Sequence, residues 1–385
     1  MAPGRRTRIL IVDDSVVMRS LLRAVVSHDA GLEVTGTAAD GDAALRMIAS
    51  TGFDVVLLDV EMPVKDGLAT LRELRARGHR MPVIMCSSRT QRGASVTIEA
   101  LAGGASDYVA KPQGQSGREV ATQALAQELI PKIHALTGQA QAGFAASGST
   151  PGSGLGAGAV RFPPAVAVMP GLKAQAMTGT PVVLVIGVST GGPAALDVLL
   201  PALPGDFPLP VLIVQHMPEV FTGLFAERLN GRCRLRVREG SQGDAVRAGT
   251  VFIARGNWHM EVLAASRAGS GPTLHLSQGP LENHCRPSAD VLFRSAAGVY
   301  GAGVLAVVLT GMGSDGMLGC RAIREQGGSV LAQDQASSTV WGMPGAVANA
   351  GLANRIVPLG AMAAEILRVV SRKSSEAREL RERAV

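Results

Sequence analysis

The sequence has 385 residues, of which 46% are hydrophobic and 18% charged, with a formal net charge of +6. This length exceeds one ordinary core and the composition is globular, so we expect two domains and exclude a disordered chain. Aromatic residues make up only 3%, which argues against nucleic-acid binding, and no apolar run approaches the roughly 18 residues of a membrane span.

The cysteines indicate a reducing compartment. Cys86, Cys233, Cys285 and Cys320 are scattered, with no C-x-x-C pair, which favours free thiols over disulfides or a zinc site. The N-terminal residues turn acidic almost at once, and they contain no apolar stretch typical of a secretory signal. We therefore expect a cytoplasmic protein.

Short β-branched runs alternate with helix-length amphipathic stretches in the first half of the chain. Strands are predicted at residues 8–14, 32–38, 53–60, 82–88 and 105–112, with helices such as 16–27 and 42–50 between them. This alternation predicts a parallel sheet with helices on both faces, whose ligands collect at the carboxyl ends of the strands. We assign residues 1–136 to this first α/β domain, with a closing helix within 116–136.

Chemically active side chains stand at these predicted strand ends. The first strand ends in Asp13 and Asp14, the third in Asp59, the fourth in Ser87, and the fifth in Lys111. Three carboxylates at one edge require a cation, and oxygen-only ligands suit Mg²⁺. Lys111 and Ser87 could hold an incoming phosphoryl group, with Asp59 as the nucleophile. A lone aspartate would be interpreted as a helix cap, but the complete set favours chemistry.

This set resembles the receiver domain of two-component response regulators, a flavodoxin-like fold, over roughly residues 5–125. The resemblance implies that a histidine kinase supplies the phosphoryl group to Asp59. It assigns the Mg²⁺ ligands and the phosphate and switch residues as follows: Asp13, Asp14, Asp59 and the backbone carbonyl of Glu61 for the metal, and Ser87, Tyr108 and Lys111 for the phosphoryl group and its switch. An ordinary buried strand tyrosine is the alternative for Tyr108. Lys65 departs from the apolar residue that is commoner at its position.

Residues 137–180 change to Gly, Ala, Ser and Pro. Few large apolar residues recur there, so we predict a flexible linker. A second domain over residues 181–372 follows it, and a charged tail, residues 373–385, extends the last helix.

The glycine-rich stretch "IGVSTGG", residues 186–192, directly follows an apolar predicted strand. Gly187 to Gly191 fits G-x-S-x-G, a strand-to-helix turn that exposes the oxygen of Ser189. By itself the motif fits a nucleophile, a phosphate cradle or a structural turn. The P-loop lysine and the ribose-binding acid are both absent, which disfavours a nucleotide site.

A serine nucleophile needs a base and a carboxylate that orients the base. His216 ends the next apolar strand, and Asp315 lies in the glycine turn after the apolar run 304–309. Asp244, Asp290 and Asp334 compete with Asp315, but none follows so strongly buried a strand. The chain order Ser, His, Asp differs from that of α/β-hydrolases, so that fold is not implied. Backbone N–H groups of the two glycine turns could supply an oxyanion hole.

Four motifs after the receiver and linker make the resemblance specific: "IGVSTGGP", "VQHMP", "NHCRPSADVLFRS" and "LTGMGSDG". They are similar to the chemotaxis response regulator protein-glutamate methylesterase/protein-glutamine glutaminase family (CheB). The resemblance implies a three-layer αβα domain with a mostly parallel sheet and no cofactor for the ester chemistry. It assigns Ser189 as nucleophile, His216 as general acid/base and Asp315 as orienting carboxylate, and the N–H groups of Thr190 and Met312 as oxyanion donors. Arg255 departs from the proline usual at its position.

The same resemblance implies γ-methyl glutamyl esters, and some glutamines, on methyl-accepting chemoreceptors as substrates, with methanol or ammonia released. A chemotaxis histidine kinase would be the phosphodonor, and we expect a monomer in which the unphosphorylated receiver covers the Ser189 edge. Two alternatives stay open: a phosphorylation-gated binding protein and an esterase acting on small molecules. A further pattern, Arg232, Arg234, Arg236 and Arg238 at period two, predicts one basic strand face, either solvated or docking an acidic partner.

Overall fold

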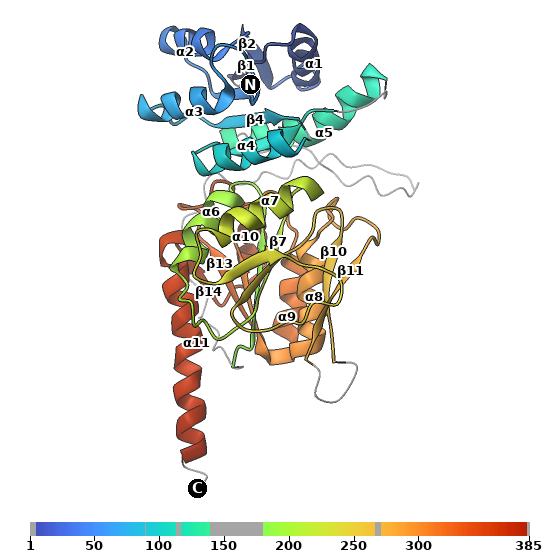
Figure 1. Ribbon diagram of the computed structural model, residues 1–385, viewed down its shortest axis with the longest axis vertical. Coiled ribbons are helices and arrows are strands. Elements are labelled where there is room, and N and C mark those ends of the chain that lie inside the picture. Colours follow the sequence, from blue (N-terminus) through green and yellow to red (C-terminus); the bar gives the residue numbers. More distant parts are fainter. Residues whose placement is uncertain (1–4, 89, 113–116, 139–179, 266–270, 383–385) are drawn as a thin grey trace, which may run out of the picture.

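The computed structural model describes residues 5–88, 90–112, 117–138, 180–265 and 271–382. Most of the predicted linker, residues 139–179, lies outside the described residues. The described chain forms two α/β domains that contact each other (Figure 1). Within these ranges, no helix combines the length and apolarity that crossing a membrane requires.

The N-terminal domain is a five-stranded parallel sheet with the order β2-β1-β3-β4-β5. Its strands are β1 (Thr7–Val12), β2 (Leu32–Ala38), β3 (Val55–Asp59), β4 (Val83–Ser87) and β5 (Asp107–Ala110). Its helices are α1 (Val16–Val26), α2 (Gly41–Ser50), α3 (Gly67–Ala76), α4 (Gln91–Ala102) and α5 (Arg118–Thr137). Helices α1 and α5 cover one face and α2, α3 and α4 the other, so the predicted flavodoxin-like fold is confirmed.

The C-terminal domain contains a seven-stranded parallel sheet with the order β14-β13-β12-β6-β7-β9-β8. Its strands are β6 (Val183–Val188), β7 (Val211–Gln215), β8 (Arg236–Glu239), β9 (Thr250–Ile253), β12 (Val304–Val308), β13 (Ser329–Gln333) and β14 (Arg355–Val357). Beside this sheet lies an antiparallel pair, β10 (His259–Leu263) and β11 (Thr273–Ser277).

Helices cover both faces of this sheet, which confirms the predicted three-layer arrangement. One face carries α6 (Gly192–Leu199), α7 (Glu219–Asn230) and α11 (Leu359–Glu382). The other face carries α8 (Ala289–Tyr300), α9 (Met317–Glu325) and α10 (Met343–Asn349). Two short 3₁₀ turns, η1 (Leu200–Ala202) and η2 (Gly301–Gly303), precede β7 and β12.

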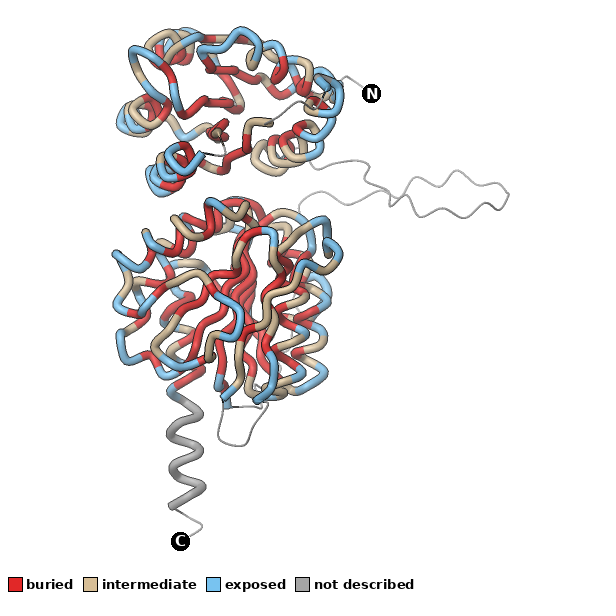
Figure 2. Tube along the Cα trace, turned by 45° about the vertical axis from the view of Figure 1, so that its right-hand side comes forward, coloured by how far each residue is buried: buried red, intermediate tan, exposed pale blue. Residues whose placement is uncertain are grey.

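The central strands form because their sequences are apolar at every position. Strands β6, β7 and β12 read VLVIGV, VLIVQ and VLAVV, and every residue in them is buried. A continuous apolar run is the pattern of a parallel strand covered on both faces. Figure 2 shows these strands as the buried centre of the domain, with exposed segments around them. The loops at the carboxyl ends of these three strands are therefore held on a rigid support.

One surface expectation agrees with the structure and another changes. Helix α11 continues through Glu382 and projects from the domain, so the predicted tail from residue 373 is continuous with the last helix (Figure 1). Of the four arginines predicted to share a strand face, only Arg236 and Arg238 lie in β8. The N–H groups of Arg232 and Cys233 bond to Leu229 at the end of α7, which keeps that part of the run in a turn.

The receiver packs on the helices at the carboxyl edge of the second sheet. Helix α4 lies against α6 and α7 (Figure 1). The ring of Tyr108 on β5 stacks on Phe221 of α7, with centroids 4.8 Å apart. The hydroxyl of Thr190 donates to the Asp107 carboxylate across 2.6 Å. The interface is thus formed by both apolar and polar contacts.

Candidate functional site

The three residues predicted for nucleophilic chemistry follow three neighbouring strands. Val188 of β6 pairs with Gln215 of β7, and β12 pairs with β6 on its other side. Ser189 and His216 therefore leave the sheet side by side, and the N–H of His216 donates to the Val188 carbonyl at 3.2 Å. The loop after β12 carries Asp315 to the same edge.

The turn around Ser189 is fixed by its glycines and by the loop after β12. Gly191 has φ +77°, and a Cβ at this position would lie 2.4 Å from the Thr339 side chain. The N–H of Ser189 donates to the Thr310 carbonyl at 3.0 Å. Within the described ranges, the N–H groups of Thr190 and Met312 have no protein acceptor. Two donors are thus free beside the half-buried serine.

His216 and Asp315 form a close pair. His216 Nε2 lies 2.7 Å from Oδ2 of Asp315, and both side chains are largely buried. The carboxylate also accepts four bonds from the segment that begins α8. These donors are Asn283 Nδ2 at 2.8 Å, Ser288 Oγ at 2.7 Å, the Ala289 N–H at 2.6 Å and the Asp290 N–H at 3.1 Å. The N-terminus of α8 therefore holds Asp315 as an anion.

The pair is electrostatically coupled. Burial alone would raise the pKa of Asp315, but hydrogen bonds from His216, Ser288 and the Ala289 N–H outweigh it and lower that pKa far below its usual range. Burial would lower the pKa of His216, yet its hydrogen bonds to Asp315 and Cys285 raise it to about 10. The same hydrogen bonds therefore favour the protonated form of His216 and the anionic form of Asp315.

The hydroxyl of Ser189 is not hydrogen-bonded to His216 among the described residues. His216 Nδ1 instead lies 3.6 Å from the Cys285 sulfur. The side-chain amide of Gln215 joins the two loops, because its Nε2 donates to the carbonyls of Ser189 at 3.0 Å and of His216 at 3.3 Å. A side-chain rotation must therefore precede proton transfer, as is common in enzymes without bound substrate.

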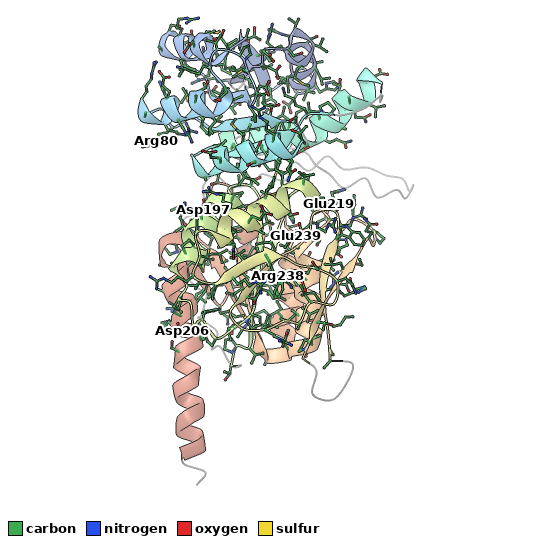
Figure 3. The ribbon with its side chains drawn as sticks, in the orientation of Figure 1. Arg80, Asp197, Asp206, Glu219, Arg238 and Glu239 are labelled. Carbon is green, nitrogen blue, oxygen red and sulfur yellow. The ribbon has the colours of Figure 1, made fainter. Side chains whose placement is uncertain are left out.

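The competing carboxylates have other partners. Asp290 accepts from the Gly319 N–H at 2.6 Å and from Asn283. Asp244 forms an ion pair with Arg238 on β8 (Figure 3). Asp334 accepts a hydrogen bond from the hydroxyl of Ser337. Of these acids, Asp315 is the one that the structure brings to His216.

The acidic residues predicted for the receiver also meet at one edge. Carboxylate oxygens of Asp13, Asp14 and Asp59 lie within 4.8 Å of one another. Lys111 Nζ lies 2.8 Å from Asp13 and 2.7 Å from Asp59. Burial and the nearby Asp13 outweigh Lys111 and raise the pKa of Asp59 to about 6. Asp13 Oδ2 is buried without an aligned donor despite its closeness to Lys111, so this oxygen-only set fits a divalent cation.

The remaining receiver residues lie around this edge. Ser87 is buried at the end of β4, where its hydroxyl donates to the Ser88 carbonyl at 3.1 Å. The exposed side chain of Glu61 approaches Arg92. Tyr108 lies in the domain interface rather than beside Lys111. Lys65 bridges Asp42 and Glu73 between α2 and α3, which is a structural role for this unusual residue.

Arg255, the other unusual residue, forms an ion pair with Glu219 at the start of α7, whose position is shown in Figure 3. Its guanidinium also lies over the ring of Trp258, 5.9 Å from the centroid. The substitution is therefore accommodated by contacts within the loop.

Sequence reasoning did not find Asn283, Cys285 or Gln215 at this site. Gln215 and His216 are adjacent in "VQHMP", and the other two flank His284 in the motif that resembled the family. Their presence in matching motifs was the available signal. Their contacts to Asp315, His216 and Ser189 emerge only from the fold.

Each of the two domains matches a known protein family. Residues 184–366 match the family model described as CheB methylesterase, and residues 9–123 match that described as response regulator receiver domain. The chain is 45% identical to a protein-glutamate methylesterase/protein-glutamine glutaminase of Trichodesmium erythraeum, over 94% of this chain and 98% of that one. It is 47% identical to a protein of the same name from Nocardioides sp., over 95% and 96%. The crystal structure of the Thermotoga maritima CheB methylesterase catalytic domain, 37% identical, covers 49% of this chain and 99% of that one, with a TM-score of 0.48.

Proposed function

Because the chain belongs to the protein-glutamate methylesterase/protein-glutamine glutaminase family, we propose that Ser189, His216 and Asp315 catalyse its hydrolysis of glutamyl γ-methyl esters and glutamine amides on chemoreceptors. The observation that carries these assignments is the His216–Asp315 hydrogen bond at the strand edge that also holds Ser189. The carboxylate orients the imidazole, which removes the serine proton.

The reaction proceeds in two steps on these residues. His216 Nδ1 is the nitrogen left to accept the proton of Ser189, because Nε2 is bonded to Asp315. The serine oxygen attacks the ester carbonyl, and His216 returns the proton to the departing methanol, or to ammonia from glutamine. The free N–H groups of Thr190 and Met312 stabilise the oxyanion. Water, deprotonated by His216, then releases glutamate and restores Ser189.

The receiver regulates this activity through Asp59. Asp13, Asp14, Asp59 and the backbone carbonyl of Glu61 would hold Mg²⁺, which would neutralise charge on the incoming phosphoryl group. Asp59 attacks the phosphoryl group, and Lys111 and Ser87 bind its oxygens. The phosphodonor is a histidine kinase, and Tyr108 transmits the change to α7, where its ring already stacks on Phe221. The protein would act in the cytoplasm as a monomer, where it reaches the receptor helices.

The test is methanol release from methylated chemoreceptors by the full-length protein. Ser189→Ala should lower the rate about 10⁴-fold or more, because no other side chain supplies the nucleophile. Asp59→Asn should keep the basal rate and lose its stimulation by a phosphodonor. A fluorophosphonate should label the wild type and spare His216→Ala. Methanol release by Ser189→Ala at the wild-type rate would overturn the assignment.

A further inference from the structure

A tight turn lies against the His216–Asp315 pair. The backbones of Glu282 and Cys285 bond to each other in both directions, at 3.1 and 2.9 Å. The two residues between them, Asn283 and His284, have φ of 51° and 62°. Positive φ at both central positions is characteristic of a type I′ turn, a conformation that asparagine tolerates well and histidine less so. Backbone in this region is retained where surrounding contacts determine it, often at functional sites.

The turn contacts both members of the pair. Asn283 Nδ2 donates to Asp315 Oδ1 and to Asp290 Oδ2, each at 2.8 Å. Cys285 places its sulfur 3.6 Å from His216 Nδ1. The side chains before and after His284 therefore bracket the carboxylate and the imidazole from one short segment.

Asn283 separates two buried carboxylates that would otherwise repel each other. Asp290 and Asp315 are 0% and 2% exposed, and two like charges so close are unfavourable without shared donors. An amide NH₂ carries two hydrogens, so it can donate to both anions at once. Asn283 shares Oδ1 of Asp315 with Ser288 Oγ and the Asp290 N–H, while Oδ2 bonds to His216 Nε2 and the Ala289 N–H. Asn283 itself is an exposed residue, so its substitution leaves the apolar core intact.

We propose that Asn283 is a positioning residue for ester hydrolysis: its amide fixes the rotation of the Asp315 carboxylate, and the 282–285 turn thereby sets the His216 ring for proton transfer. The inference rests on the catalytic roles proposed above and adds a residue that acts only through Asp315. The charged and titratable groups around the imidazole are Asp315 and Cys285, with Asp290, Glu282 and Arg294 behind the carboxylate.

The positive φ of Asn283 allows the amide to be tested apart from the backbone. Asn283→Gly keeps the turn and removes the amide, whereas Asn283→Asp keeps the shape and replaces a donor with an anion. Glu282→Ala is the matched control, because it breaks the Glu282–Arg294 ion pair of the same turn without touching Asp315. Thermal unfolding of each full-length variant reports whether the fold is kept.

Steady-state hydrolysis of p-nitrophenyl acetate over a range of pH is the measurement. Asn283→Gly should lower kcat about 10- to 100-fold and leave KM nearly unchanged, because the misplaced base affects the reaction and not substrate binding. Asn283→Asp should also lower kcat and move the acid limb of kcat/KM to higher pH, since an added negative charge favours the imidazolium. Glu282→Ala should keep the wild-type kcat and pH profile.

The outcomes separate this inference from the proposed function. If Ser189→Ala is inactive and Asn283→Gly has the wild-type kcat, the catalytic assignment stands and the positioning role is wrong. Equal losses in Asn283→Gly and Glu282→Ala would show that only turn stability matters, which also overturns it. If Ser189→Ala hydrolyses the ester normally, the proposed function itself fails. Should Asn283→Gly not fold, kcat of Asn283→Asp at a pH where the imidazole is neutral decides, and a wild-type value there overturns the positioning role.

Discussion

The Asp315 carboxylate is surrounded by hydrogen-bond donors of the protein, which take the place of water. Five donors surround it, and they lower its pKa, while the same contact raises the pKa of His216 to about 10. In the proposed reaction, the neutral imidazole accepts the proton of Ser189. Asp315 would then stabilise the imidazolium that this transfer forms, and it would restrict the activity of the base to higher pH.

The titration of His216 should follow from this pairing. Imidazole resonances of His216 should titrate well above 6.5, and kcat/KM should rise with pH through the same pKa. Asp315→Asn should lower that pKa, because the anion that holds the proton is gone, and should reduce kcat about 10⁴-fold. NMR titration of the wild type and the variant checks both. A His216 pKa near 6.5 in both proteins would show that the pair is not coupled.

At this scale, strand ends were predictable and loop contacts were not. Ser189, His216 and Asp315 follow apolar runs whose ends share an edge in any parallel sheet, so their convergence could be inferred without coordinates. The partners Asn283 and Cys285 lie 32 residues from Asp315 and 69 from His216, respectively. Their side chains arrive through the positive-φ turn, and no periodicity encodes such a turn.

The elements set how closely the two glycine turns approach. Gly311, after β12, lies against Ser189: a Cβ there would be 2.8 Å from the Cβ of Ser189 and 2.4 Å from the sulfur of Met343. Gly298, on the exposed side of α8, has nothing within 4 Å of the same position. Close packing therefore requires a glycine at position 311 but not at position 298, although neither residue has a positive φ.

Alanine at these positions should act in opposite directions. Gly311→Ala should displace Ser189, lower esterase activity at least about tenfold and destabilise the fold by about 1–3 kcal/mol. Gly298→Ala should stabilise it by up to about 1 kcal/mol, because alanine restricts the unfolded chain and favours helix. Denaturant unfolding together with ester hydrolysis measures both effects. Unchanged activity in Gly311→Ala would mean that the loop yields without moving the serine.

In the whole molecule, the receiver domain lies on the edge that holds Ser189. Thr190 follows Ser189 directly and binds Asp107, which Lys132 of α5 also approaches at 3.5 Å. Strand–helix alternation predicted both domains, and the docked receiver agrees with the expectation that it covers this edge. The packing of α4 on α6 and α7 could not be predicted, because side chains at a domain interface produce no periodic pattern in the sequence of either domain.

Loss of the Thr190 hydroxyl should favour separation of the domains. A hydrogen bond to a charged group contributes about 1.5–3 kcal/mol, so Thr190→Val should raise the unphosphorylated rate of methanol release about tenfold or more, up to the phosphorylated wild-type rate. The phosphorylated rates of the two proteins should agree, since the bond is then already broken. An unchanged basal rate would show that this contact does not hold the receiver in place.

Strand β5 connects the contact between the two domains to the acidic edge of the receiver over a short distance. Its first residue, Asp107, accepts a hydrogen bond from Thr190 of the C-terminal domain, and Lys111, just beyond its end, forms an ion pair with Asp59. Four residues of extended chain span only about 13 Å. Under the proposed function, a displacement of Lys111 on phosphorylation of Asp59 would reach Thr190, the residue next to Ser189, along this single extended strand and not through either hydrophobic core.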